Sequence, residues 1–197
     1  MAESGCLRDG IFQNLSTTKL VLGSTTLNEP IENTGKVTVI STDAASTLTA
    51  ADNSNSIVLI TKTPTTQRII SLPALSTMNA GDKITFVVAE EMAAHATNTF
   101  TIQEDTASDT NVIYGCVTVV SGGDAATGSA LTNLVATNGD AVGVTNIILS
   151  AATDSNVAGS AGSVLTLTCI GSSTKYWLVS GMLKTLDPNS TGAGIFS

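Results

Sequence analysis

The residue types that carry acid–base and nucleophilic chemistry are sparse in this chain. His95 is the only histidine, and it lies near Glu90 and Glu91 in AEEMAAHATN. A nucleophilic triad needs a histidine beside an activated serine and a carboxylate, and the sequence has no GxSxG motif. We therefore interpret His95 as a loop residue and expect no catalytic residues in this protein.

Acidic side chains gather in QEDTASD, residues 103–109, which supplies Glu104, Asp105 and Asp109. Carboxylates bind calcium, but this run lacks the spacing and the glycine of an EF-hand loop. One histidine is too few for a zinc site. We interpret the run as a solvated acidic turn, with calcium binding as the alternative, and expect no metal and no cofactor.

The glycines of VSGGDAATGSA, residues 120–130, resemble a phosphate-binding loop only in composition. No GK[ST] follows them and no helix is predicted to supply amide groups, so they indicate an ordinary loop. The three cysteines, Cys6, Cys116 and Cys169, are widely spaced and form no CxxC pair. They are interpreted as small buried apolar residues, with a disulfide between Cys116 and Cys169 as the alternative.

The overall composition is that of a folded chain with a neutral, hydroxyl-rich surface. Of its 197 residues, 42% are hydrophobic and only 12% are charged, against about 25% charged in ordinary soluble domains. The net charge is −8 and the eight basic residues form no cluster. Nucleic-acid binding needs a basic face, and an anionic membrane would repel this chain, so we expect neither as a partner. We find neither a signal peptide nor an apolar membrane span, and expect synthesis in a cytoplasm without export through a cleaved signal.

Elements that could position functional side chains are mainly strands. Runs of valine, isoleucine, leucine and threonine recur between glycine, asparagine, aspartate and serine, which is typical of β-structure. The predicted strands cover residues 36–41, 56–61, 68–72, 83–89, 99–103, 112–120, 131–137, 144–150, 163–170 and 175–180.

Alternation predicts which faces of these strands are buried. In KITFVVA, Ile84, Phe86 and Val88 share one face; in NTFTIQ, Phe100 and Ile102 point inward, while Thr99, Thr101 and Gln103 point outward.

Helix signals are confined to residues 41–52 and 90–96, which are too short for the crossover helices that parallel strands require. The fold class predicted is therefore all-β: a single antiparallel β-sandwich or jelly-roll-like domain. This domain spans residues 36–182, with an extended N-terminal arm over residues 1–35 and a C-terminal tail over residues 183–197. We find no fixed repeat period and therefore expect no solenoid.

Residues 162–181, GSVLTLTCIGSSTKYWLVSG, read as a hairpin with its loop at residues 171–174. Tyr176 and Trp177 point to opposite faces of the second strand, so we predict that one ring anchors the core. The other then lies on the outer face, against a tail or another subunit. A sugar-stacking platform is the alternative to these structural anchors.

The tail ends in an apolar pair, Ile195 and Phe196. Terminal segments stay ordered only when they are tied down. Either this pair folds back on its own domain, or it docks on a neighbouring molecule as a partner contact.

Three stretches carry a resemblance to a known class: TLTAADNSNSIVLI (residues 47–60), RIISLPALSTMNAGDKITFVV (residues 68–88) and the hairpin. They resemble small structural proteins of tailed bacteriophages, among them head decoration (cement) proteins. The resemblance implies a β-sandwich or jelly roll, often a homotrimer, on the surface of an icosahedral capsid in the virion. The implied function is non-enzymatic: to bind the major capsid protein and stabilise the assembled head.

Two other functions stay open at this point. One is a fibre, spike or receptor-binding module that recognises a host glycan through exposed aromatic rings and polar loops. The other is a glycan hydrolase, which needs a pair of carboxylates in a cleft; the low charge and scattered acids argue against it.

Overall fold

The computed structural model describes residues 20–22, 25–27, 36–90, 97–104, 112–121, 131–135, 143–150, 158–185 and 195–196. The chain divides into two units, Met1–Thr34 and Gly35–Ser197. In the first unit, strand β1 (Leu20–Leu22) pairs antiparallel with β2 (Thr25–Leu27). Every other element described belongs to the second unit.

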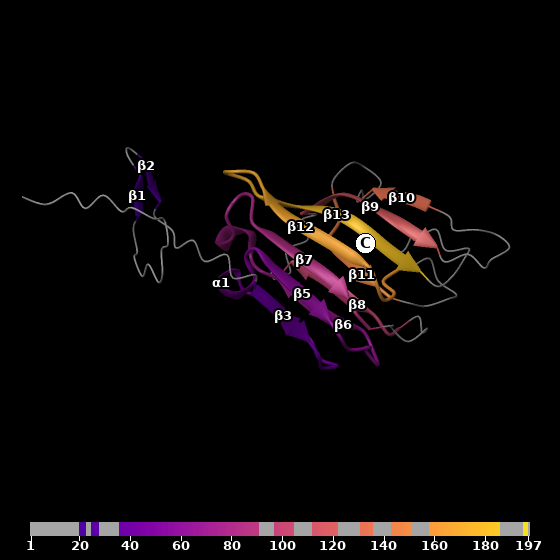
Figure 1. Ribbon diagram of the computed structural model, residues 1–197. Coiled ribbons are helices and arrows are strands. Elements are labelled where there is room, and N and C mark those ends of the chain that lie inside the picture. Colours follow the sequence, from indigo (N-terminus) through magenta and orange to yellow (C-terminus); the bar gives the residue numbers. More distant parts are fainter. Residues whose placement is uncertain are drawn as a thin grey trace, which may run out of the picture. The chain divides into compact units, whose positions relative to one another are not determined.

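Two β-sheets make up the described part of the second unit (Figure 1). The seven-stranded sheet has the order β10 (Leu131–Val135), β9 (Ile113–Ser121), β13 (Tyr176–Thr185), β12 (Val164–Ile170), β7 (Lys83–Val88), β5 (Ser56–Ile60) and β3 (Lys36–Ile40). The four-stranded sheet has the order β11 (Asn146–Leu149), β8 (Phe100–Glu104), β6 (Arg68–Leu72) and β4 (Ser46–Thr47). Two short helices connect strands, α1 (Ala50–Asn53) and the 3-10 helix η1 (Leu75–Thr77).

The mostly-β class is confirmed, and each strand predicted between residues 36 and 182 is present with small shifts at its ends, except that the last one, predicted to end at residue 180, continues to Thr185. The β-branched, alternating runs are a sufficient signal because each buries one face. Strand β4 has only two residues and is not among the predicted strands. Of the two predicted helical segments, residues 41–52 contain the start of α1, and residues 91–96 lie outside the described part of the chain.

The prediction of purely antiparallel pairing is wrong, because the sheets are mixed. Along the chain, β3 to β8 alternate between the two sheets. Two neighbours in one sheet are therefore joined through a strand of the other sheet, and the pairs β3–β5, β5–β7, β4–β6 and β6–β8 run parallel. Strands β9 and β13 are also parallel. The prediction requires the crossover to be a helix, whereas here a strand of the opposite sheet makes it.

Both sheets contribute side chains to one hydrophobic core. Ile84, Phe86 and Val88 of β7 are buried as the alternation predicts, and so are Phe100 and Ile102 of β8. Thr99 and Thr101 are predicted to face solvent, yet they are only 7% and 4% exposed.

For Thr101 the reason is a covering side chain, because the amide Nε2 of Gln67 donates a hydrogen bond of 3.0 Å to its hydroxyl. Strand β13 continues to Thr185, past the domain boundary expected at residue 182, because Leu183 and Thr185 extend its buried face.

The predicted hairpin is formed by β12 and β13, which pair antiparallel from Ile170–Tyr176 to Val164–Met182. Its loop depends on Gly171, whose φ is +93°. A Cβ at this position would lie 2.0 Å from the carbonyl oxygen of Thr174, so any side chain would force the turn apart.

Candidate interaction surface

Polar side chains of α1 and of the residue before it cap the helix and attach it to β3. Thr49 caps the helix: its Oγ1 accepts a hydrogen bond of 3.2 Å from the Asp52 backbone N–H and donates one of 2.7 Å to the Asp52 carboxylate. Asn53 is buried, and its Oδ1 accepts from the Thr49 N–H at 3.0 Å while its Nδ2 donates to Thr38 Oγ1 at 2.8 Å. The helix is therefore fastened to β3 through the Asn53–Thr38 bond.

Strand β3 is the last strand of the seven-stranded sheet on this side, so one of its edges has no strand partner among the described residues. Its pairing with β5 is continuous over all five residues, from Lys36–Ser56 to Ile40–Ile60. Val37 and Val39 point to the outer face and are 57% and 51% exposed. The ammonium group of Lys36 donates a hydrogen bond to the Ala51 carbonyl at 2.5 Å, so it is held against α1.

An apolar row crosses the outer face of the same sheet. The strand registers align Val39 with Leu59, Leu59 with Val87, Val87 with Val164, and Val164 with Met182. These five side chains form what is here named the outer apolar row. Met182 is 47% exposed, and the three central residues are half-buried. The neighbouring row holds Ile57, which is 42% exposed, beside the hydrogen-bonded hydroxyls of Thr85 and Thr166.

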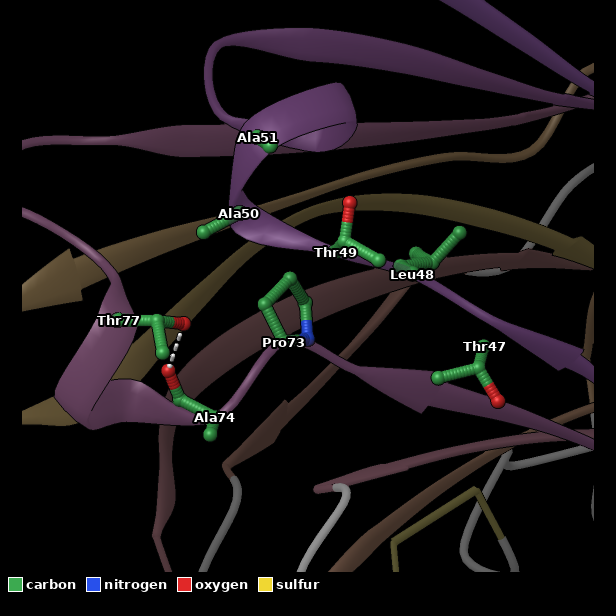
Figure 2. Close-up of a pocket in the computed structure, with 8 residues that line it drawn as sticks. All are labelled: Thr47, Leu48, Thr49, Ala50, Ala51, Pro73, Ala74 and Thr77. Atoms are coloured by element: carbon green, nitrogen blue, oxygen red, sulfur yellow. Dashed lines mark hydrogen bonds between the residues drawn. The ribbon is translucent and has the colours of Figure 1, made fainter.

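A shallow hollow of about 460 Å³ lies between the β4–α1 segment and the β6–η1 segment. Figure 2 shows the small side chains that line it, together with the hydrogen bond of 2.7 Å from Thr77 Oγ1 to the Ala74 carbonyl. No charged residue lines the hollow, which consists of Thr47, Leu48, Thr49, Ala50, Ala51, Pro73, Ala74 and Thr77. Its chemistry suits an apolar side chain rather than a reacting substrate.

Arg68 and Asp43 form an ion pair in the described part of the chain. Arg68 Nε lies 2.7 Å from Asp43 Oδ1, and the Thr65 hydroxyl donates to the same carboxyl group. The hydrogen bond from Arg68, followed by that from Thr65, holds the pKa of Asp43 well below its ordinary value.

Asp82 is the buried carboxylate of a turn. It accepts hydrogen bonds from Asn55 Nδ2 at 3.0 Å and from the Asn79 N–H at 2.9 Å. Burial raises the pKa of Asp82, but the hydrogen bonds from Ser54, Asn79 and Asn55 outweigh that effect and leave the pKa below its ordinary value. Neither Asp82 nor Asp43 is thus a poised proton donor.

The two rings singled out in the sequence face opposite ways. Trp177 is 0% exposed within the core, and its indole N–H has no hydrogen-bond partner among the described residues. Tyr176 is half-buried on the outer face, where it meets Tyr114 edge-to-face with centroids 5.1 Å apart and planes at 87°. One ring therefore lies in the core, and the other forms an aromatic pair at the surface.

The apolar pair at the end of the tail lies against its own domain. Ile195 is 0% exposed, and its carbonyl accepts a hydrogen bond of 2.7 Å from the Ile148 N–H. Phe196 is half-buried and forms a bridge with Ile147 of β11. Contact of this pair with a partner stays a prediction, and it would involve the part of Phe196 that is exposed.

Of the cysteines and the acids of residues 103–109 singled out in the sequence, the structure describes Cys116, Cys169 and Glu104. Both cysteines are free, so the disulfide alternative is wrong. The prediction that they are buried is confirmed for Cys169 and wrong for Cys116, which is exposed. Burial raises the pKa of the Cys169 thiol. Glu104 is half-buried at the end of β8, whereas Cys6, His95, Asp105, Asp109 and the loop over residues 122–130 lie outside the described residues.

Two further features bear on the classes of function considered. Within the described ranges, no three histidine, cysteine or acidic side chains approach one another closely enough to hold a metal ion. The helices in these ranges all lack the length and apolar character needed to span a bilayer.

The residues that sequence reasoning missed are the exposed apolar ones of β3 and of the outer apolar row. A signal for them exists in KVTVI, where valines occupy the positions opposite the buried face, but edge position is not visible in a sequence. Comparisons of the chain with protein-family models, with curated proteins and with solved structures give no match. The surface is therefore interpreted from its own geometry.

Proposed function

We propose that this chain is a non-enzymatic structural protein of a phage virion that decorates the assembled capsid. Its partner in this proposal is the major capsid protein, and its two sheets are the layers of a β-sandwich. The function is physical: binding only to the assembled shell stabilises that shell by mass action. Many copies on one shell would add to the effect through avidity.

The observation that carries the proposal is the outer apolar row. It runs across five neighbouring strands, from Val39 on β3 to Met182 on β13. Contiguous apolar surface on a soluble protein marks a site of association. On one side the row is flanked by hydroxyl groups, those of Thr85 and Thr166, and on the other side Lys184 follows Met182 on the same face of β13. Such a surface suits a broad protein contact better than a substrate pocket.

The alternative is a module that binds a host surface glycan, and one observation favours it. Tyr114 and Tyr176 form a half-buried aromatic pair on the outer face. Sugars stack on exposed aromatic faces. In this pair, however, the edge of one ring covers the face of the other, which reduces the area on which a sugar could stack.

Co-sedimentation with bare phage heads, with host cells and with host polysaccharide tests the proposal. We expect the protein to sediment with heads and to protect them against heat. Met182→Glu, which places a charge in the outer apolar row, should weaken head binding by about tenfold or more. Ile69→Glu is the matched control, since Ile69 is 38% exposed on β6 of the other sheet. Sedimentation with cells or polysaccharide but not with heads would contradict the proposal.

A further inference from the structure

We propose that two copies of this chain associate through β3, edge to edge and antiparallel, about a two-fold axis at Thr38. The inference concerns the purified protein and is independent of capsid binding. It also differs from the homotrimer that the resemblance implies.

The first reason is the open backbone edge of β3. Among the described residues, β5 pairs with one side of β3 and no strand pairs with the other. The outward N–H and C=O groups of such an edge form a template on which an extended strand can pair. Because the pairing with β5 has no interruption over residues 36–40, β3 presents a regular edge along its whole length.

The second reason is that β3 lacks the features that keep edge strands apart. Monomeric proteins protect their edges with proline, bulges or lysines that reach into solvent. β3 has the sequence KVTVI, without proline, and pairs with β5 without a bulge. Its lysine, Lys36, is turned to the Ala51 carbonyl. The exposed apolar side chains at the edge are Val37 and Val39, which favour burial; Lys36 is exposed as well.

The third reason identifies the occupant as a second copy. Val37, Thr38 and Val39 read the same in both directions, so antiparallel pairing centred on Thr38 is self-complementary. Val37 then lies opposite Val39 of the partner subunit, twice, and Thr38 lies opposite Thr38 of the partner subunit. A two-fold axis requires this antiparallel arrangement. β-branched pairs on neighbouring strands are favourable, and β3 has no acidic residue that would repel its copy.

The inner side of β3 is already fixed, which lowers the cost of association. Thr38 Oγ1 accepts from Asn53 Nδ2, and α1 packs beneath the strand. The strand is thus held in its extended form by β5 and α1 before a partner arrives. Pre-organisation of this kind reduces the entropy lost on binding.

The experiment measures native mass by sedimentation equilibrium over a range of protein concentrations. We expect the wild-type protein to dimerise. Val37→Lys and Val39→Glu, each alone, place a charge opposite a valine and should weaken the dimer about tenfold or more. Ile69→Lys, at an exposed site on the other sheet, should dimerise like the wild type.

Mixing the two variants tests the register itself. In a mixed dimer, the lysine that Val37→Lys introduces in one subunit lies opposite the glutamate that Val39→Glu introduces in the other, and the second pair is again valine with valine. The equimolar mixture should therefore recover dimerisation, which neither variant shows alone. A monomer or trimer at all concentrations, single variants that match Ile69→Lys, or a mixture without recovery would each overturn the proposal. Circular dichroism on every variant shows that the fold is retained.

Discussion

At the scale of single residues, Trp177 shows how burial can outweigh an unmade hydrogen bond. A ring of its size buries about 150–250 Å², which is worth about 4–6 kcal/mol as an upper limit. Its indole N–H has no partner among the described residues, and an unsatisfied buried donor costs about 1–3 kcal/mol. The difference remains favourable, so the ring stabilises the core despite its unpaired N–H. Because Trp177 is the only tryptophan, its fluorescence reports unfolding of this core.

The buried carboxylate of Asp82 makes stability depend on pH. Its folded-state pKa lies below the ordinary value, which is about 3.9 for aspartate in unfolded chains. A depressed pKa contributes stability that is present above pH of about 4 and is lost as the pH falls further. We expect the wild-type free energy of unfolding to decrease on acidification below about pH 4, with a shallower decrease for Asp82→Asn.

Urea titrations followed by Trp177 fluorescence at several pH values measure this dependence. Asp43→Asn is the comparison variant. Asp43 also has a lowered pKa, but it lies in an ion pair near the surface, and such pairs contribute little to stability. Its acid slope should therefore stay closer to that of the wild type than the slope of Asp82→Asn does. Equal acid slopes for the wild type and Asp82→Asn would refute the argument.

At the scale of elements, the glycines on either side of β12 distinguish two costs of replacing glycine. Gly171 and Gly162 have φ values of +93° and +91°. A Cβ at Gly171 meets the Thr174 carbonyl oxygen at 2.0 Å, whereas nothing lies within 4 Å of a Cβ at Gly162. We expect Gly162→Ala to lower the free energy of unfolding by about 1–2 kcal/mol, through backbone strain alone. Gly171→Ala should lower it by about 2–4 kcal/mol, because the turn must also move.

Thermal and urea unfolding of the wild type and the two variants measure how much each substitution lowers the free energy of unfolding. If Gly171→Ala is no less stable than Gly162→Ala, then the close approach to Thr174 is not a property of the folded protein.

Apart from the two-residue β4, the strands between residues 36 and 182 were predictable from the sequence, but their partners were not, except in the β12–β13 hairpin. Alternation in KITFVVA shows that Ile84 and Phe86 are buried, whichever strand lies beside them. Whether β7 pairs with β5 or with β6 depends on which sheet each strand enters, and both carry the same kind of apolar run. The parallel ladders follow from that choice, which no local pattern records. For the same reason, the edge position of Val37 and Val39 could not be predicted, although their alternation could.

At the scale of the second unit, the end of the tail is part of the core. Ile195 is 0% exposed, and replacing a buried isoleucine by alanine costs about 2–5 kcal/mol. We expect Ile195→Ala to lower the free energy of unfolding within this range. Ile69→Ala, the same change at a side chain that is 38% exposed, should change it by less than about 0.5 kcal/mol.

Equilibrium unfolding of the two variants measures the difference. An Ile195→Ala protein as stable as Ile69→Ala would mean that the tail leaves this site in solution, and the pair would then be free to dock on a neighbour.

The position of β13 has a consequence for the order in which the protein is completed. Strand β13 is the last strand along the described chain, yet it sits between β9 and β12, inside the seven-stranded sheet. Until the ribosome has released residues 176–185, β9 and β10 have no connection to the half-sheet made by β12, β7, β5 and β3. A nascent chain therefore carries two incomplete parts of the sheet, and β13 joins them when it pairs with β9 on one side and β12 on the other. Translation that stops before residue 176 would leave both halves with unpaired strand edges, so the seven-stranded sheet is completed only once β13 has left the ribosome.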